Sequence, residues 1–189
     1  LVFDDALDGK YAALWHFNEL VNNVGAFDLT RTADSSGYSN TGKLMGGVAF
    51  PLKNNGWLGK ALVFNGTTGR VGVAHATSLN PVNQITVEMR VKLAADPNCD
   101  GNNNYRVLLA KGASYSLILE ENRVLHGRVQ VQGGVTYDII SNAGVVALNA
   151  WTHVAFQYDA ASGVLVFLVD GVETSRVTMP AKPLQGTTD

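Results

Sequence analysis

The chain has 189 residues, of which 46 % are hydrophobic and 16 % charged, and its formal net charge is −2. This length suits one domain, and the ordinary apolar fraction excludes wholesale disorder. No apolar run approaches the ~18–20 residues that cross a bilayer, and the near-neutral charge excludes a basic surface for nucleic acid. The 20 glycines interrupt helices and favour short strands and turns.

Alternation of apolar and polar residues is the strongest local pattern in the chain. In Gln84–Leu93 every second residue is apolar, which predicts a strand with one buried and one wet face. Similar or shorter patterns predict strands, in chain order, at Ala61–Phe64, Gly69–Ala74, Arg106–Ala110, Tyr115–Leu119, Arg123–Val131 and Val135–Ile140.

The last third of the chain predicts an antiparallel meander of Thr152–Tyr158, Val164–Val169 and Val172–Thr178. Asp159–Gly163 has the length of a hairpin loop, and Asp170-Gly171 suits a type I′ turn because both of its central residues need positive φ. Helical patterns are nearly absent. About twelve short strands with regular turns favour an antiparallel sandwich or barrel.

Four stretches occur in the order and spacing of motifs that are typical of one family: Leu14–Glu19, Asp34–Gly42, Gly59–Gly66 and the closing meander from Trp151 to Gly171. Together they resemble the laminin-G-like, concanavalin-A-like jelly-roll domains of bacterial extracellular proteins. The resemblance implies an all-β fold, an antiparallel two-sheet β-sandwich. We expect a single domain over residues 1–189, with residues 1–10 as a lead-in.

The family usually ends with a further strand that carries an Ile-Asp-Glu-Val-Arg-Ile-type motif, which this sequence lacks. Residues 179–189 are therefore expected to be a tail or the start of the missing C-terminal strand. Either the domain is truncated or another segment supplies the strand at an open edge. Because the chain starts at Leu1, we interpret it as a processed or excised part of a larger protein.

The loop Asp34–Gly42 is the first candidate metal site. The resemblance implies a structural Ca²⁺ here, with Asp34, Asn40 and Glu19 as oxygen ligands. The alternative is an Asx-turn, in which Asp34 bonds its own backbone.

A second, weaker calcium candidate is the polar loop that contains Asp96, Asn98 and Asp100. Its spacing matches the first half of an EF-hand loop, but Val107 stands where the bidentate Glu would be. A plain solvated loop is the alternative. Cys99 lies in the same loop, and its role is undetermined.

No catalytic constellation is present in the sequence. Glycan-cleaving jelly rolls commonly place carboxylates on alternate positions of one strand, so that both face the cleft. Glu120 and Glu121 are adjacent and would face opposite ways. We therefore predict that the chain is not an enzyme.

Sugar binding requires exposed aromatic rings beside polar side chains. Trp57 and Tyr105 lie in expected loops, and Arg128 lies on the wet face of a strand, so these three are the candidate carbohydrate-binding residues. Trp15 and Trp151 lie in apolar patterns and are expected in the core. Four outward side chains form a larger candidate surface, which either binds a ligand or is simply solvated: Arg90, Lys92, Arg128 and Gln130.

These features predict a non-catalytic carbohydrate-binding or adhesion module of a larger bacterial protein, extracellular or at the cell surface. Its expected partner is a glycan or polysaccharide, or another protein. One alternative is a structural spacer or protein-interaction domain without a small ligand. Another is a glycan-cleaving enzyme whose site the sequence does not reveal.

Overall fold

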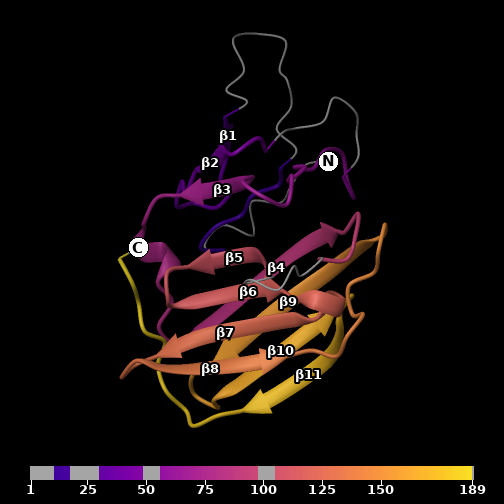
Figure 1. Cartoon of the computed structure of the whole chain (residues 1–189). Helices are drawn as coiled ribbons and strands as arrows, with labels where there is room; N and C mark the ends of the chain where they lie inside the picture. The colour runs from indigo at the N-terminus through magenta and orange to yellow at the C-terminus, as the bar shows by residue number, and fades with distance from the viewer. Residues whose placement is uncertain (1–10, 18–29, 49–55, 98–104, 189) are drawn as a thin grey trace. The chain divides into compact units, whose positions relative to one another are not determined.

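The computed structural model describes residues 11–17, 30–48, 56–97 and 105–188 (Figure 1). The chain divides into two compact units, Leu1–Leu79 and Asn80–Asp189. The described residues form strands and two short 3₁₀ turns, η2 (Thr77–Leu79) and η3 (Glu121–Arg123). Within these ranges no helix is long and apolar enough to cross a membrane. That the whole chain forms one domain stays a prediction.

The first unit contains a three-stranded antiparallel sheet in the order β1-β2-β3. Its strands are β1 (Arg31–Thr32), β2 (Gly42–Met45) and β3 (Arg70–Val73). The strand expected around Gly69–Ala74 is confirmed by β3. The strand expected at Ala61–Phe64 is wrong, because only one bridge residue interrupts an irregular segment there.

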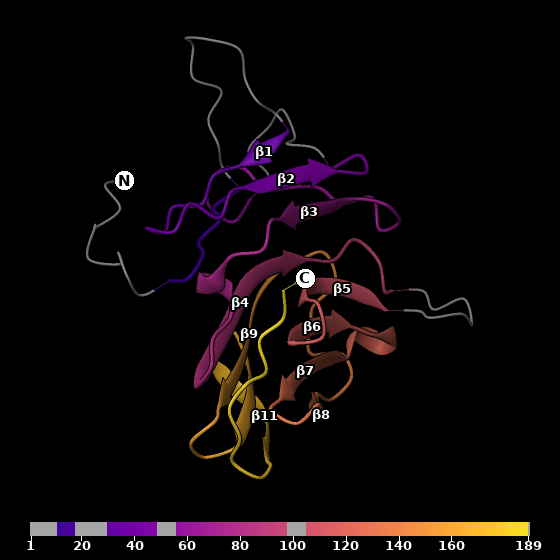
Figure 2. The same cartoon turned by 90° about the vertical axis from the view of Figure 1, so that its left-hand side faces the viewer.

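The second unit contains two four-stranded antiparallel sheets, which Figure 2 shows as two layers. One sheet has the order β11-β10-β9-β4, with the bounds β11 (Val172–Thr178), β10 (Val164–Val169), β9 (Trp151–Asp159) and β4 (Gln84–Lys92). The other has the order β5-β6-β7-β8, with the bounds β5 (Arg106–Lys111), β6 (Tyr115–Leu119), β7 (Leu125–Val131) and β8 (Val135–Ile140). The predicted all-β, two-sheet sandwich is confirmed.

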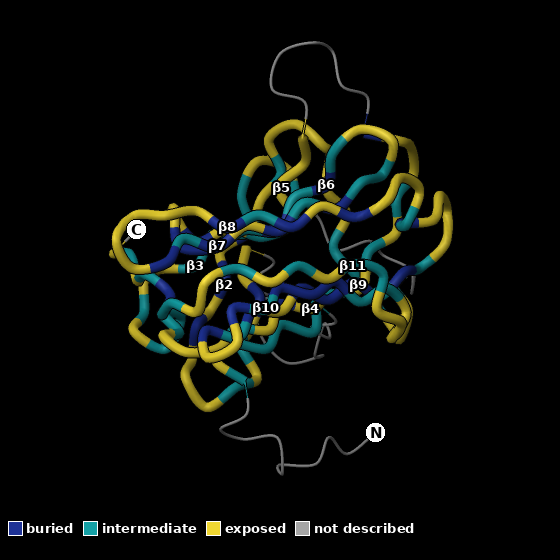
Figure 3. Tube along the Cα trace, turned by 90° about the horizontal axis from the view of Figure 1, so that it is seen from below, coloured by how far each residue is buried: buried dark blue, intermediate teal, exposed yellow. Residues whose placement is uncertain are grey.

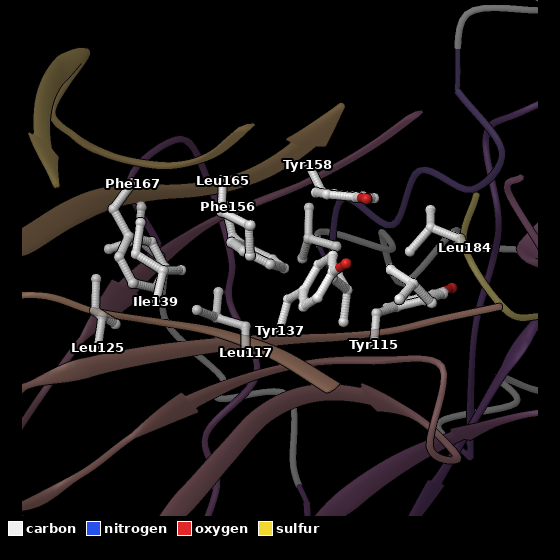
Figure 4. Packing of buried hydrophobic residues seen from close by; sticks show 14 of the residues in the cluster. Tyr115, Leu117, Leu125, Tyr137, Ile139, Phe156, Tyr158, Leu165, Phe167 and Leu184 are labelled. Carbon is white, nitrogen blue, oxygen red and sulfur yellow. The ribbon is translucent and has the colours of Figure 1, made fainter. Parts of the chain in front are cut away.

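The core of the second unit lies between its two sheets. Because side chains alternate along a strand, each sheet turns every second residue inward. Leu117 and Leu125 extend from one sheet toward Phe156 and Phe167 of the other (Figure 4). The rings of Phe156 and Phe167 lie 5.6 Å apart between centroids. The buried segments in Figure 3 follow the strands, as packing between the two sheets requires.

Two positions of the second unit require glycine, one for its positive φ angle and one for a close contact with an aromatic ring. Asp170 and Gly171 have φ values of 49° and 80°, so the turn between β10 and β11 has the two positive φ angles that its sequence predicts. Gly127 of β7 faces the core, and a Cβ atom there would lie 2.7 Å from the ring of Phe156. Only glycine allows this close approach without movement of the ring.

The last residues described, 179–188, pack against the second unit. Leu184 is 2 % exposed and forms an antiparallel bridge with Val131 of β7. Tyr137 Oη donates to the carbonyl of Pro180 at 2.9 Å, and Tyr158 Oη donates to the carbonyl of Lys182 at 2.6 Å. One tyrosine from each sheet therefore anchors this segment. A missing C-terminal strand stays a prediction.

Candidate functional site

Asp34 is the centre of a hydrogen-bonded loop in the first unit. Its Oδ1 accepts from the backbone N–H groups of Leu14 at 2.8 Å and Ser36 at 2.9 Å. Its Oδ2 accepts from Ser36 Oγ and from the backbone N–H of Asn40, both at 2.7 Å. Burial raises the pKa of Asp34, but these hydrogen bonds outweigh burial and hold the pKa below its ordinary value.

Asn40 ties the same loop to neighbouring segments. Its Nδ2 donates to the carbonyl of Ala12 at 2.7 Å and to Ser78 Oγ at 3.1 Å, and its backbone carbonyl accepts from Trp15 Nε1 at 2.8 Å. The carboxylate of Asp34 has about four acceptor positions, and four donors already occupy them. This arrangement matches the Asx-turn alternative.

The metal ligands expected from the sequence are only partly described. Glu19, Asn98, Cys99 and Asp100 lie outside the described residues. Asp96 lies within the described residues. Its Oδ2 is 3.3 Å from Nε of Arg123, so the two form an ion pair, but Arg123 Nε makes no hydrogen bond. Across the described ranges no group of three or more His, Cys, Asp or Glu side chains is arranged to hold a metal. Structural Ca²⁺ in either loop stays a prediction.

A charged cluster lies in the second unit, on the sheet β5-β6-β7-β8. His126 Nδ1 lies 2.7 Å from Oε1 of Glu120, and His126 Nε2 lies 2.8 Å from Oδ1 of Asp138. Arg128 Nε donates to the same Asp138 oxygen at 2.7 Å. Both ring nitrogens of His126 therefore lie within hydrogen-bond distance of a carboxylate oxygen.

The environment of Asp138 keeps it ionised. Burial raises the pKa of Asp138, but hydrogen bonds and charge from Arg128 and His126 outweigh burial and bring the pKa below its ordinary value. The cluster is therefore a fixed set of charged donors and acceptors. The side chains of Arg128 and Asp138 are 46 % and 38 % exposed, so a ligand in solvent can reach both.

Strand register places the charged cluster on the face of the sheet that points away from the core. His126 is opposite Ile118 on one side and Ile140 on the other, and Val107 is opposite Ile118. Val107 and Ile140 are 52 % and 57 % exposed. Charged side chains thus lie beside apolar ones across all four strands. We call this surface of β5–β8 the outer face.

Arg128 belongs to this outer face, and Tyr105 directly precedes β5 in the chain. Tyr105 is 46 % exposed and lies outside the strand. Trp57 is 55 % exposed but lies in the first unit. Of the three candidate carbohydrate-binding residues, two therefore lie in the second unit.

Two expectations about the surface are wrong. Arg90 and Lys92 lie in β4, which belongs to the other sheet from Arg128 and Gln130, so the four do not form one surface. Trp15 and Trp151 are half-buried and are not core residues. Trp151 is opposite Lys92 and shares its outward side, because the next residue, Thr152, is the inward one.

Comparison with known proteins gives the family. Residues 65–189 match the family model described as the Concanavalin A-like lectin/glucanases superfamily. The comparison with curated proteins gave no match.

Solved structures with a similar fold include two toxin domains. The binding domain of Paraclostridial Mosquitocidal Protein 1 has 16 % identity and a TM-score of 0.65, with 85 % of this chain and 42 % of that chain covered. The binding domain of botulinum neurotoxin serotype G has 11 % identity and a TM-score of 0.62, with 83 % and 39 % covered. The chain thus spans about two fifths of these domains.

A third similar structure is Domain 4 of AbnA, a GH43 extracellular arabinanase from Geobacillus stearothermophilus, in complex with arabinotriose. It has 22 % identity and a TM-score of 0.53, with 83 % of this chain and 76 % of that chain covered. At these identities the similarity to all three structures shows the fold alone.

Proposed function

Because the chain belongs to the Concanavalin A-like lectin/glucanases superfamily, we propose that it is a non-catalytic carbohydrate-binding module of a larger secreted or cell-surface bacterial protein. The observation that carries this proposal is the outer face, where the exposed Arg128–Asp138 pair lies, with exposed Tyr105 directly before the edge strand β5. β7 alone has seven residues, which is about 20 Å of strand. An oligosaccharide of several rings fits along such a length.

The chemistry of the outer face suits sugars. A tyrosine ring stacks on the apolar face of a pyranose or furanose, while a guanidinium and a carboxylate donate to and accept from hydroxyls. Arg128 and Asp138 hold each other in place, so little side-chain entropy is lost when a ligand binds. The fold similarity to a domain solved with arabinotriose, and to two toxin binding domains, supports a binding role.

The same cluster argues against hydrolysis. A glycosidase needs one carboxylic acid whose pKa is raised, so that it can protonate the leaving oxygen. The pKa of Asp138 is lowered instead, and Glu120 contacts His126. A carboxylate that Arg128 holds ionised can orient hydroxyls, but it is not poised as a general acid.

Protein recognition is the second candidate function for this surface. Val107 and Ile140 are more than half exposed, and exposed apolar side chains beside charges are typical of protein interfaces. This candidate predicts that the chain binds no polysaccharide and that Ile140→Asp abolishes binding to the protein partner.

The test is affinity gel electrophoresis on a panel of polysaccharides that includes arabinan. We expect retardation on at least one gel, and we expect Tyr105→Ala to weaken binding about 3- to 10-fold through the lost stacking. Tyr38→Ala is the matched control, because Tyr38 is 54 % exposed but lies in the first unit. No retardation on any polysaccharide would overturn the proposal. Release of reducing sugar by the wild type would show an enzyme instead.

A further inference from the structure

A hollow of about 450 Å³ opens in the second unit, near the end of β7. Its lining has seven residues, none charged and none aromatic: Asn80, Ala113, Gln130, Gln185, Gly186, Thr187 and Thr188. Amides and hydroxyls therefore supply its polar side-chain atoms.

The hollow continues the outer face. Gln130 lies two residues after Arg128 in β7, and alternation directs His126, Arg128 and Gln130 to the same side. Successive side chains on one side of a strand are about 7 Å apart. The charged cluster and the uncharged hollow are thus neighbouring parts of one surface.

Gln130 is held by its backbone while its side chain is free to bind. Its backbone N–H donates to the carbonyl of Ser114 at 2.7 Å, and its carbonyl accepts from the N–H of Gln185 at 2.9 Å. Its carboxamide makes no hydrogen bond to another described residue. A fixed backbone with an unpartnered amide is a pre-organised donor and acceptor.

The wall of the hollow is also fixed. Asn80 Nδ2 donates to the carbonyl of Thr187 at 3.0 Å, which ties the end of residues 179–188 to the start of the second unit. Gln185 Oε1 accepts from the backbone N–H of Gly134 at 3.1 Å, and this contact leaves the NH₂ group of Gln185 for a ligand. Thr188 adds a hydroxyl to the lining.

We propose that this hollow is a binding subsite for an uncharged, hydroxyl-rich sugar residue, contacted by Gln130, Gln185 and Thr188. The inference rests on the proposed carbohydrate-binding function and names the sugar class and a place where it binds. A carboxamide donates and accepts at once, as neighbouring sugar hydroxyls require. An anionic sugar would lose hydration here without a cationic partner, so uronates and sulfated sugars are disfavoured.

A second hollow, of about 530 Å³, lies on the other sheet and offers fewer free groups. Its lining includes Asp159 and Arg176, but these already have partners. Asp159 accepts from Ser162 Oγ at 2.7 Å, and Arg176 donates to Glu173 at 2.6 Å and 2.8 Å. Gln157, which also lines this hollow, therefore provides a matched control for Gln130.

The experiment is isothermal titration with arabinotriose and cellotriose as neutral probes and trigalacturonate as the anionic probe. Side-chain NH₂ resonances are followed by NMR in the same titrations. We expect a neutral probe to bind and to shift the Gln130 NH₂ signals. Gln130→Ala and Thr188→Val are each expected to weaken binding about 3- to 10-fold, the effect of one lost hydrogen bond. Gln157→Ala is expected to leave the affinity unchanged.

The outcomes separate this inference from the proposed function. If a neutral probe binds and Tyr105→Ala weakens it, but Gln130→Ala and Thr188→Val do not, the subsite is wrong and the carbohydrate-binding function stands. Binding of trigalacturonate alone, or loss of binding in Gln157→Ala, also overturns the subsite only. If no probe binds and no polysaccharide retards the chain, both proposals fall.

Discussion

The two units of the chain are stabilised by different kinds of contact. Among the described residues of the first unit, the buried side chains are those of Thr32, Asn40 and Leu44, and only Leu44 is apolar. The second unit buries a continuous apolar cluster between two sheets, with Phe156 and Phe167 fully enclosed. Apolar burial depends on area and tolerates similar shapes, whereas hydrogen bonds need particular atoms in particular places. The stability of the first unit should therefore depend on single hydrogen-bonding atoms, and the stability of the second on the volume of its buried side chains.

The largest effect is expected from Phe156→Ala in the core of the second unit. Removing a fully buried ring leaves a cavity and costs about 3–5 kcal/mol of unfolding free energy. Urea unfolding followed by circular dichroism measures the loss. Ile140→Ala is the control, because Ile140 is 57 % exposed, and we expect about 0.5 kcal/mol or less. Equal losses in both variants would contradict the assigned core.

Asp34→Ala should cost the first unit about 2–3 kcal/mol, because one truncation leaves the N–H groups of Leu14, Ser36 and Asn40 without an acceptor. Hydrogen exchange of these three amides measures the loss of protection. Asp34→Asn, which keeps one acceptor oxygen, should lose less. Unchanged exchange in Asp34→Ala would show that the loop does not depend on this carboxylate.

The same variant tests the proposed calcium site. If Ca²⁺ binds in this loop, EDTA lowers the melting temperature of the wild type, and Asp34→Ala no longer responds to EDTA. If Asp34 only accepts hydrogen bonds, Asp34→Ala lowers the melting temperature equally in EDTA and in Ca²⁺. The filled acceptor positions of Asp34 favour the second result.

Gly127→Ala probes volume in the second unit. A new methyl group would lie 2.7 Å from the Phe156 ring and 3.0 Å from the Phe167 ring, and overpacking of this kind costs about 1–3 kcal/mol. Gly37→Ala in the first unit is the matched control, because a Cβ atom there meets nothing within 4 Å. Urea midpoints compare the two variants. A neutral Gly127→Ala would mean that the rings can shift without cost.

The smallest effect on stability is expected when the pH is lowered. The pKa values of Asp34 and Asp138 in the folded chain lie below the ordinary 3.8. Their stabilising bonds are therefore complete at neutral pH and are lost as the pH falls below 3.8 toward the folded values. We expect amides near Asp34 to lose protection first, because the first unit has less apolar burial. Carboxyl NMR titration measures both groups, and a folded pKa of either at or above 3.8 would contradict the assignment.

The strands of the second unit could be predicted because alternation is a local property. The alternating segment Gln84–Leu93 predicts β4 almost as the structure has it. Val164–Val169 is a continuous apolar run, and it predicts β10 because it follows a hairpin loop. β1 has only two residues, Arg31–Thr32, too few to show a period. Ala61–Phe64 has apolar residues, but only Val63 pairs with another segment, as a single bridge. A pattern can therefore indicate that a strand is possible, but pairing decides whether it forms.

The charged cluster of the outer face was missed for a related reason. His126, Arg128 and Gln130 alternate with apolar residues of β7, and this pattern was visible in the sequence. Their partners lie elsewhere: Glu120 follows β6, and Asp138 is in β8. The register of three strands brings these side chains together, and one sequence does not specify that register. The Asx-turn at Asp34 could be anticipated from local spacing, but its bond to Leu14 could not.

The contact between Asn80 and Thr187 also bears on how the second unit assembles. The two residues are 107 positions apart, and Leu184 N–H donates nearby to the carbonyl of Val82 at 2.8 Å. Closing so long a loop costs entropy that later contacts must recover, so this contact should form late in folding. The hollow is lined by residues from both segments that this contact joins. Binding competence should therefore appear after the sheets have formed, and a bound sugar would slow the opening of this closure.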